Sequence, residues 1–146
     1  MGVIQDIKDK FITSEIYSIY SLCMYQPTWE KFISKAAEYM NSQTTSIFGY
    51  YLDGHIAGVI VINQDQKGGE FPLIRGIAIN YENRNQGIGR QLIQYACKVL
   101  GLSILTAETD DDAVSFYIRC GFKTEEFMLT FDSGEYRRYK CVLYNN

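Results

Sequence analysis

Residues 81–93, YENRNQGIGRQLI, read as the exit of a strand, a glycine-containing turn and the first turns of an amphipathic helix. The centre of this stretch is Arg84-x-x-Gly87-x-Gly89, and a second arginine follows at Arg90. A helix N-terminus offers unpaired N–H groups and about half a positive charge. Because glycine has no Cβ, a bulky anion can approach such a backbone closely. The stretch therefore suits a pyrophosphate, although the same glycines could simply shape a turn before a core helix.

Two better-known phosphate-binding loops do not fit this turn. The dinucleotide-binding fingerprint needs a third glycine, and Leu92 occupies that position. A Walker loop needs Gly-Lys followed by Ser or Thr, and the sequence has no such run. The failed fingerprints argue against a general nucleotide-binding protein.

The composition is that of an ordinary globular protein. The 146 residues are 47% hydrophobic and 21% charged, so we expect one hydrophobic core and a single domain over residues 1–146. The formal net charge of −3 argues against non-specific binding to nucleic acid. No apolar run is long enough to span a membrane, and the N-terminus does not resemble a signal peptide. We therefore expect a cytoplasmic protein with no membrane partner.

The cysteines and the histidine do not predict a metal site. The four cysteines form no CxxC pair, and His55 is the only histidine. Their positions are Cys23, Cys97, Cys120 and Cys141. We expect no metal cofactor and a reduced compartment.

Hydrophobic periodicity predicts a mixed α/β chain with the order β-α-α-β-β-β-α-β-α-β-β. Apolar residues recur at helical spacing over 14–24, from an N-cap at Thr28 to about residue 40, over 86–100 and over 110–122. Strands are expected over 3–7, on both sides of an Asp53-Gly54 hairpin turn, and over 71–80, 103–108, 122–132 and 136–144. Gly101 and Gly121 suit the ends of the last two helices.

The region 71–122 resembles the GNAT superfamily of acetyl-CoA-dependent N-acetyltransferases. The strand LIRGIAIN precedes Arg84-Asn85-Gln86-Gly87-Ile88-Gly89, which matches the family signature Arg/Gln-x-x-Gly-x-Gly/Ala. The later run DDDAVSFYIRCGF is similar to the family's second helix motif, with Asp110 where the family often has Asn. The resemblance implies a mixed α/β, α+β-like fold, with a mostly antiparallel central sheet of about six or seven strands and about four flanking helices.

The resemblance also implies a site for acetyl-CoA. Backbone N–H groups of the turn and first helical residues would hold the coenzyme A pyrophosphate, beside the cations Arg84 and Arg90. The main chain of Ile77 and Ile79 would bind the pantetheine arm, and an N–H near Ile77 or Ala78 would face the thioester carbonyl. The implied cofactor-binding residues are Ile77, Ala78, Ile79, Arg84, Gln86, Gly87, Ile88, Gly89, Arg90, Asp110 and Tyr117.

The implied reaction is direct attack of a primary amine on the thioester within a ternary complex. Tyr117 matches the family's tyrosine near the coenzyme sulfur and is the expected general acid, although it could also be a buried aromatic that packs on the cofactor. Glu70 and Glu108 are candidates for the base, although the more usual interpretation of each is an ordinary polar residue. His55 follows a hairpin turn, far from the expected centre, and is discounted.

The acceptor is not identified by the sequence. Tyr25 and Trp29 flank Pro27 and are the expected residues of the substrate pocket, since Tyr17 and Tyr20 share the spacing of core positions. Arg137 and Arg138 could pair with a substrate carboxylate or be surface charges.

Small amines, amino acids, antibiotics, polyamines and protein N-termini all remain open, and the negative net charge favours a cationic acceptor. A catalytically inactive acyl-CoA sensor or docking module on the same fold is the alternative. The family resemblance implies a possible homodimer, and another acyl donor is not excluded.

Overall fold

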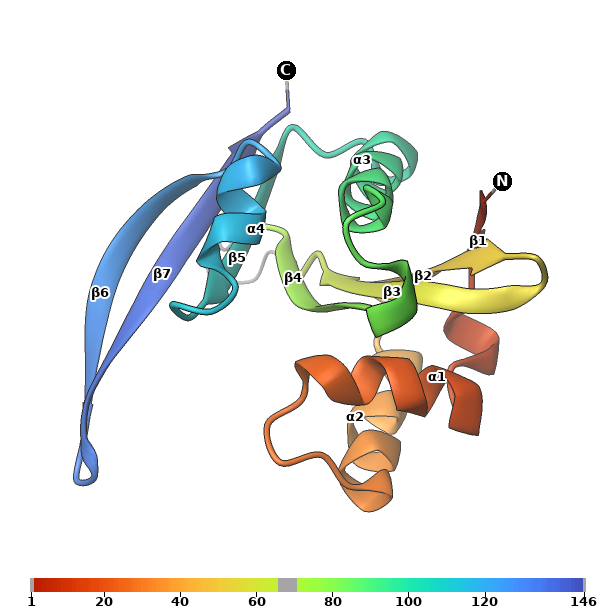
Figure 1. Ribbon diagram of the computed structural model, residues 1–146, viewed down its shortest axis with the longest axis horizontal. Coiled ribbons are helices and arrows are strands. Elements are labelled where there is room, and N and C mark those ends of the chain that lie inside the picture. The colour runs from red at the N-terminus through yellow and green to blue at the C-terminus, as the bar shows by residue number, and fades with distance from the viewer. Residues whose placement is uncertain (1, 66–70, 146) are drawn as a thin grey trace.

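The computed structural model describes residues 2–65 and 71–145 (Figure 1). Within these residues the helices are α1 (Ser14–Tyr20), α2 (Trp29–Asn41), α3 (Ile88–Leu100) and α4 (Val114–Arg119). The strands are β1 (Gly2–Asp6), β2 (Thr45–Leu52), β3 (His55–Asn63), β4 (Leu73–Ile79), β5 (Ile104–Thr109), β6 (Lys123–Phe131) and β7 (Gly134–Tyr144). No helix in these two segments combines the length and the apolar composition needed to cross a membrane.

The described strands form one seven-stranded sheet in the order β1-β2-β3-β4-β5-β7-β6. Neighbouring strands run antiparallel except β4 and β5, which run parallel. Helix α3 lies on one side of the sheet and α1 and α2 lie on the other, while the β6–β7 hairpin projects from the body (Figure 1). The predicted α/β class, strand number and helix number are confirmed.

The core is divided between the two faces of the sheet because alternate residues of a strand point to opposite faces. On one face, Leu92 and Ala96 of α3 pack with Leu105 and Cys141 of the sheet. On the other face, Tyr20 of α1, Phe32 of α2 and the preceding Phe11 pack with Ile47 and Val61 of the sheet. The strands β2–β4 are therefore covered on both sides, whereas the outer hairpin is mostly exposed.

Capping residues and turn residues close to each boundary explain where several of the helices and strands begin and end. The Thr28 side chain accepts a hydrogen bond from the Lys31 N–H, which confirms the predicted N-cap of α2. Asp53 and Gly54 both have positive φ, at 51° and 80°, as a two-residue hairpin turn requires. Gly121 has φ 94°, and the Phe122 N–H donates to the Tyr117 carbonyl at 3.0 Å in the predicted Schellman arrangement.

Two helices begin later than the sequence pattern predicted. Helix α3 begins at Ile88 rather than near Gln86, because Gly87 adopts a left-handed conformation with φ 79°. Helix α4 begins at Val114, because the Asp110 carboxylate accepts hydrogen bonds from the N–H groups of Asp112 and Ala113 and holds residues 110–113 in a turn.

Candidate functional site

The central feature of the site is a gap between the two parallel strands. β4 and β5 share one register pair within the described residues, Leu73 with Thr106, and the Thr106 N–H donates to the Pro72 carbonyl at 2.8 Å. Beyond this pair the strands separate. The β3–β4 register shifts between Val61 and Ile62, which leaves Arg75 as an extra residue on β4. Such a bulge bends the strand that carries it and so helps to open the gap.

The backbone of β4 on the open side faces this gap. The Asn80 N–H donates to the Ala57 carbonyl on β3 at 2.8 Å, which fixes the alternation of the strand. The backbone groups of Ala78 therefore point toward β3, and those of Ile77 and Ile79 point toward the gap. This is the placement that the sequence resemblance implied for the pantetheine-binding residues.

Helix α3 points its N-terminus at the same gap. The first intrahelical bond runs from the Gln91 N–H to the Gly87 carbonyl, at 3.0 Å, so the N–H groups of the first turn have no acceptor within the helix. Space at Gly89 is tight, since an added Cβ would lie 2.7 Å from the ring of Phe116 on α4. Gly89 thus allows α3 and α4 to approach each other beside the gap.

The two arginines near this turn also hold it together. The Arg84 Nε donates to the Ile79 carbonyl at 3.2 Å, and its guanidinium lies 4.0 Å from the centre of the Tyr81 ring. Arg90 donates to the Arg119 carbonyl at the end of α4. Both cations remain exposed and line the cleft, so their charges still face an incoming anion. Gln86 does not line the cleft with its side chain.

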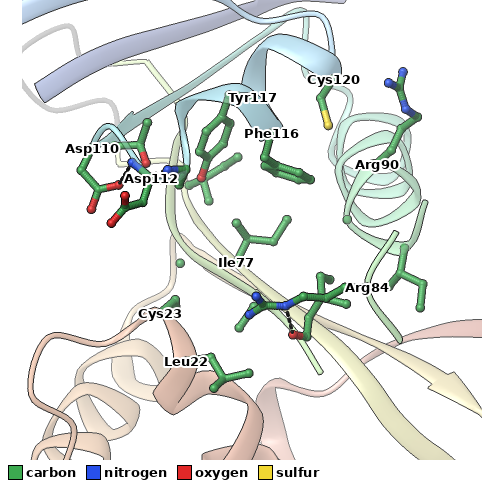
Figure 2. Close-up of a pocket in the computed structure, with 18 of the residues that line it drawn as sticks. Leu22, Cys23, Ile77, Arg84, Arg90, Asp110, Asp112, Phe116, Tyr117 and Cys120 are labelled. Atoms are coloured by element: carbon green, nitrogen blue, oxygen red, sulfur yellow. Dashed lines mark hydrogen bonds between the residues drawn. The ribbon is translucent and has the colours of Figure 1, made fainter. Parts of the chain in front are cut away.

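Tyr117 lies on α4 with its side chain directed into the gap above Ile77 (Figure 2). The residue is only 6% exposed, and its hydroxyl makes no hydrogen bond with the described residues. Burial raises the pKa of Tyr117 above its usual range, so the phenol is protonated at neutral pH. The Tyr117 hydroxyl is thus available to donate a hydrogen bond to a bound substrate. Asp110 lines the cleft, and its carboxylate accepts hydrogen bonds from the N–H groups of Asp112 and Ala113 in the turn before α4.

The candidate bases differ in position. Glu108 is exposed and lines the cleft near the end of β5. Glu70 lies outside the described residues. Glu108 is therefore the carboxylate from the sequence prediction that the structure brings to the cleft.

The aromatic residues of the predicted substrate pocket separate into two groups. Tyr25 is 83% exposed and lines the cleft. Trp29 is not among the residues that line the cleft, and it packs edge-on against Tyr17 with ring centroids 5.4 Å apart, so its role in the substrate pocket stays a prediction. Tyr20 is buried, and its hydroxyl lies 3.1 Å from that of Tyr39, so it belongs to the core.

Several residues of the cleft were not anticipated. Leu22 and Cys23 precede Tyr25 and lie below Ile77, across the gap from Tyr117 and Phe116 (Figure 2). Cys23 is exposed, and its thiol donates a hydrogen bond to the Tyr20 carbonyl at 3.2 Å. The signal for these residues is weak, because apolar side chains at the end of a helix usually belong to the core.

These elements enclose a cleft of about 1280 Å³ that runs from the N-terminus of α3 to the loop between α1 and α2. The model of the acetyltransferase (GNAT) domain matches residues 43–124, which is more than half of the chain and includes β4, α3, β5 and α4. The chain belongs to the GNAT acetyltransferase family. It is therefore an acyltransferase by family membership.

Solved structures share the fold of this GNAT chain at low sequence identity. An IAA acetyltransferase from Bacillus cereus has 20% identity and a TM-score of 0.69, with 99% of each chain covered. A GNAT acetyltransferase from Elizabethkingia anophelis with acetyl-CoA bound has 17% identity and a TM-score of 0.69, covering 98% of this chain and 97% of that one.

A third structure, a spermidine N-acetyltransferase from Vibrio cholerae, has 13% identity and a TM-score of 0.73, with coverage of 99% and 94%. A search of curated protein sequences gave no match to the chain.

Proposed function

We propose that this GNAT protein transfers an acetyl group from acetyl-CoA to a primary amine, within a ternary complex of the two substrates. The observation that carries the proposal is the unpaired edge of β4 beside the N-terminus of α3. A solved relative of the same fold has acetyl-CoA bound, which supports the choice of donor. The continuous sheet from β1 to β7 supports the view that residues 1–146 act as one domain.

In this proposal the coenzyme lies along the cleft. The N–H groups from Gln86 to Arg90 bind the pyrophosphate, where the helix dipole and the cations Arg84 and Arg90 favour negative charge. The pantetheine amides pair with the backbone of Ile77 and Ile79, which takes the place of the missing β4–β5 ladder. The thioester then lies between Ile77 and Tyr117, since both face the same gap.

The reaction needs an amine without its extra proton. The acceptor ammonium gives this proton to Glu108, and the neutral nitrogen attacks the thioester carbon and forms the C–N bond. The main-chain N–H of Ile77, which points into the gap, stabilises the oxyanion; the Ala78 N–H, the other donor that the resemblance implied, points toward β3 instead. When the C–S bond breaks, the Tyr117 hydroxyl gives its proton to the leaving thiolate, and the proton that the acylated nitrogen loses returns to the Tyr117 phenolate. The products are the acetylated amine and coenzyme A.

The test is a calorimetric titration with acetyl-CoA, coenzyme A and ADP, followed by a primary-amine panel read by thiol release. Acetyl-CoA should bind more tightly than ADP, because ADP lacks the pantetheine arm that β4 would hold. Release of the coenzyme A thiol only when an amine is present would then support acetyl transfer to that amine. Tight binding of acetyl-CoA with no acetylation of any amine would instead indicate the inactive sensor, and no binding would reject acetyl-CoA as the donor.

A further inference from the structure

One face of the outer sheet is left uncovered beside the cleft. Alternation along β5 and β7 directs Ala107 and Cys141 into the core under α3 and α4. The alternate residues Glu108 and Arg138 therefore point to the opposite face and line the cleft. Helices α1 and α2 pack on β2, β3 and β4, so the projecting β6–β7 hairpin stands apart from them (Figure 1).

The two adjacent arginines of β7 have different surroundings because they point to opposite faces. Arg137 donates to both carboxylate oxygens of Asp111, at 2.9 and 3.3 Å, and its Nη1 lies 3.7 Å from Glu126. Arg138 is half-buried in the cleft wall and makes no ion pair or hydrogen bond with the described residues. A guanidinium in this position has its fork of donors available for a carboxylate.

A carboxylate of the protein lies near this cation without pairing to it. Glu108 is opposite Lys140 in the β5–β7 register, so Arg138 is its diagonal neighbour on the same face. The Cα atoms of diagonal neighbours in an antiparallel pair are about 7–8 Å apart, within reach of two long side chains. No ion pair joins Glu108 to Arg138 or to Lys140 among the described residues. The face thus presents a carboxylate and a guanidinium that are not paired with each other and that a small zwitterion can bridge.

On this face the residues next to Arg138 are apolar toward the hairpin turn, whereas Glu125 and Lys140 lie beside it in the other direction. Phe127 lies directly opposite Arg138, and Leu129 lies opposite Tyr136, on the same face. The rings of Phe131 and Tyr136 are 5.8 Å apart and both are exposed. Across the cleft, Tyr25 presents a further exposed ring. A polyamine would gain little from these groups and would meet the cation of Arg138.

We infer that the acceptor is an α-amino acid with an apolar side chain, whose carboxylate binds Arg138 and whose ammonium binds Glu108. The side chain lies against the apolar wall formed by Phe127, Leu129 and Tyr136, which follow Arg138 on the same face toward the hairpin turn. This inference rests on the proposed function and specifies its substrate class. The negative net charge of the whole protein favours a cationic acceptor. Inside the cleft, however, the positive charge of Arg138 is close to the acceptor and favours one with a carboxylate.

The test compares three primary amines on protein saturated with coenzyme A. They are L-phenylalanine, L-phenylalaninamide, which lacks only the carboxylate, and spermidine. Calorimetry should show L-phenylalanine binding at least about tenfold more tightly than its amide, as expected for a charge-assisted bidentate contact. The kcat/KM measured by thiol release with acetyl-CoA should show the same order, and spermidine should be the poorest of the three.

Matched variants distinguish direct recognition of the acceptor carboxylate by Arg138 from a general effect of positive charge on β7. Arg138→Gln should reduce the preference for the acid over the amide to less than about twofold, and Arg138→Lys should leave an intermediate preference. Arg137→Gln removes the same charge from the opposite face, and it should keep the full preference.

The inference is overturned if the acid and the amide bind equally, if the amide or spermidine binds best, or if no amine binds while coenzyme A does. A preference for the amide would indicate a peptide N-terminus. Failure of coenzyme A itself to bind rejects the proposed function as well and is recognised before any amine is added.

Discussion

Replacing Tyr117 with Phe removes a single hydroxyl and tests the proposed general acid. The ring packs edge-on against Phe116 and Phe122, with centroids 5.2 Å apart in each case, and Phe keeps both contacts. The hydroxyl has no hydrogen-bond partner among the described residues, so no buried group loses one. We therefore expect the free energy of unfolding to change by less than about 0.5 kcal/mol.

The effect on the rate should be much larger than the effect on stability. A positioned general acid contributes roughly 10²- to 10⁴-fold to a reaction. Burial raises the pKa of Tyr117, so the phenol stays protonated but gives up its proton less readily. We place Tyr117→Phe at the lower end of the range, with kcat reduced about 100-fold, or about 2.7 kcal/mol in activation free energy.

The assay is thiol release at saturating acetyl-CoA and acceptor, with the dissociation constant of coenzyme A measured by calorimetry. Tyr95→Phe is the matched control, because Tyr95 on α3 also packs edge-on against a ring, Phe48, and is not among the residues that line the cleft. An unchanged kcat in Tyr117→Phe refutes the acid role. A loss of kcat accompanied by an equal weakening of coenzyme A binding would also refute it, because Tyr117 would then only position the cofactor.

Three further predictions concern the glycines and the buried phenols. Gly87→Ala and Gly101→Ala introduce similar left-handed strain at opposite ends of α3, about 1–2 kcal/mol each, but only Gly87→Ala should weaken acetyl-CoA binding; equal affinities in calorimetry would remove the turn from the site. Gly76→Ala places a Cβ 2.2 Å from the hydroxyl of buried Tyr20 and should cost about 1–3 kcal/mol in urea unfolding; a neutral result would mean that the ring moves freely. Burial raises the pKa of Tyr20 and Tyr117, so above about pH 10 the unfolded chain binds fewer protons than the native one, and stability should fall as pH rises; a flat alkaline profile in urea titrations would contradict this.

Much of the fold could be predicted because the residues that start and end its helices and turns are close together in the sequence. The turn at Asp53-Gly54, the cap at Thr28 and the Schellman end at Gly121 each depend on a few neighbouring residues, and all are present in the structure. The late start of α4 was missed, because the side chain of Asp110 competes with the helix for its first N–H groups.

Long-range geometry explains what the sequence could not assign at the site. The alternation of β7 could not be assigned without its register to β5, so Arg137 and Arg138 were equivalent in sequence and are on opposite faces in the structure. Trp29 was expected in the pocket because it is close to Pro27 in the chain. In the structure the first turn of α2 directs it onto Tyr17 instead.

The gap between β4 and β5 is the feature from which both halves of the proposed site arise. A regular ladder would pair the backbone of Ile77 and Ile79 with β5 and leave neither free donors nor space in the middle of the sheet. The extra residue Arg75 bends β4, and Gly76 beside it leaves room for the ring of Tyr20, so that α1 packs close to the bent strand. An unpaired strand edge is unfavourable unless polar groups satisfy it. We therefore expect the pantetheine amides to complete the sheet, while the face that α1 and α2 leave uncovered at Arg138 receives the acceptor. Donor and acceptor would thus meet at the gap beside Tyr117, each approaching from a different face of the sheet.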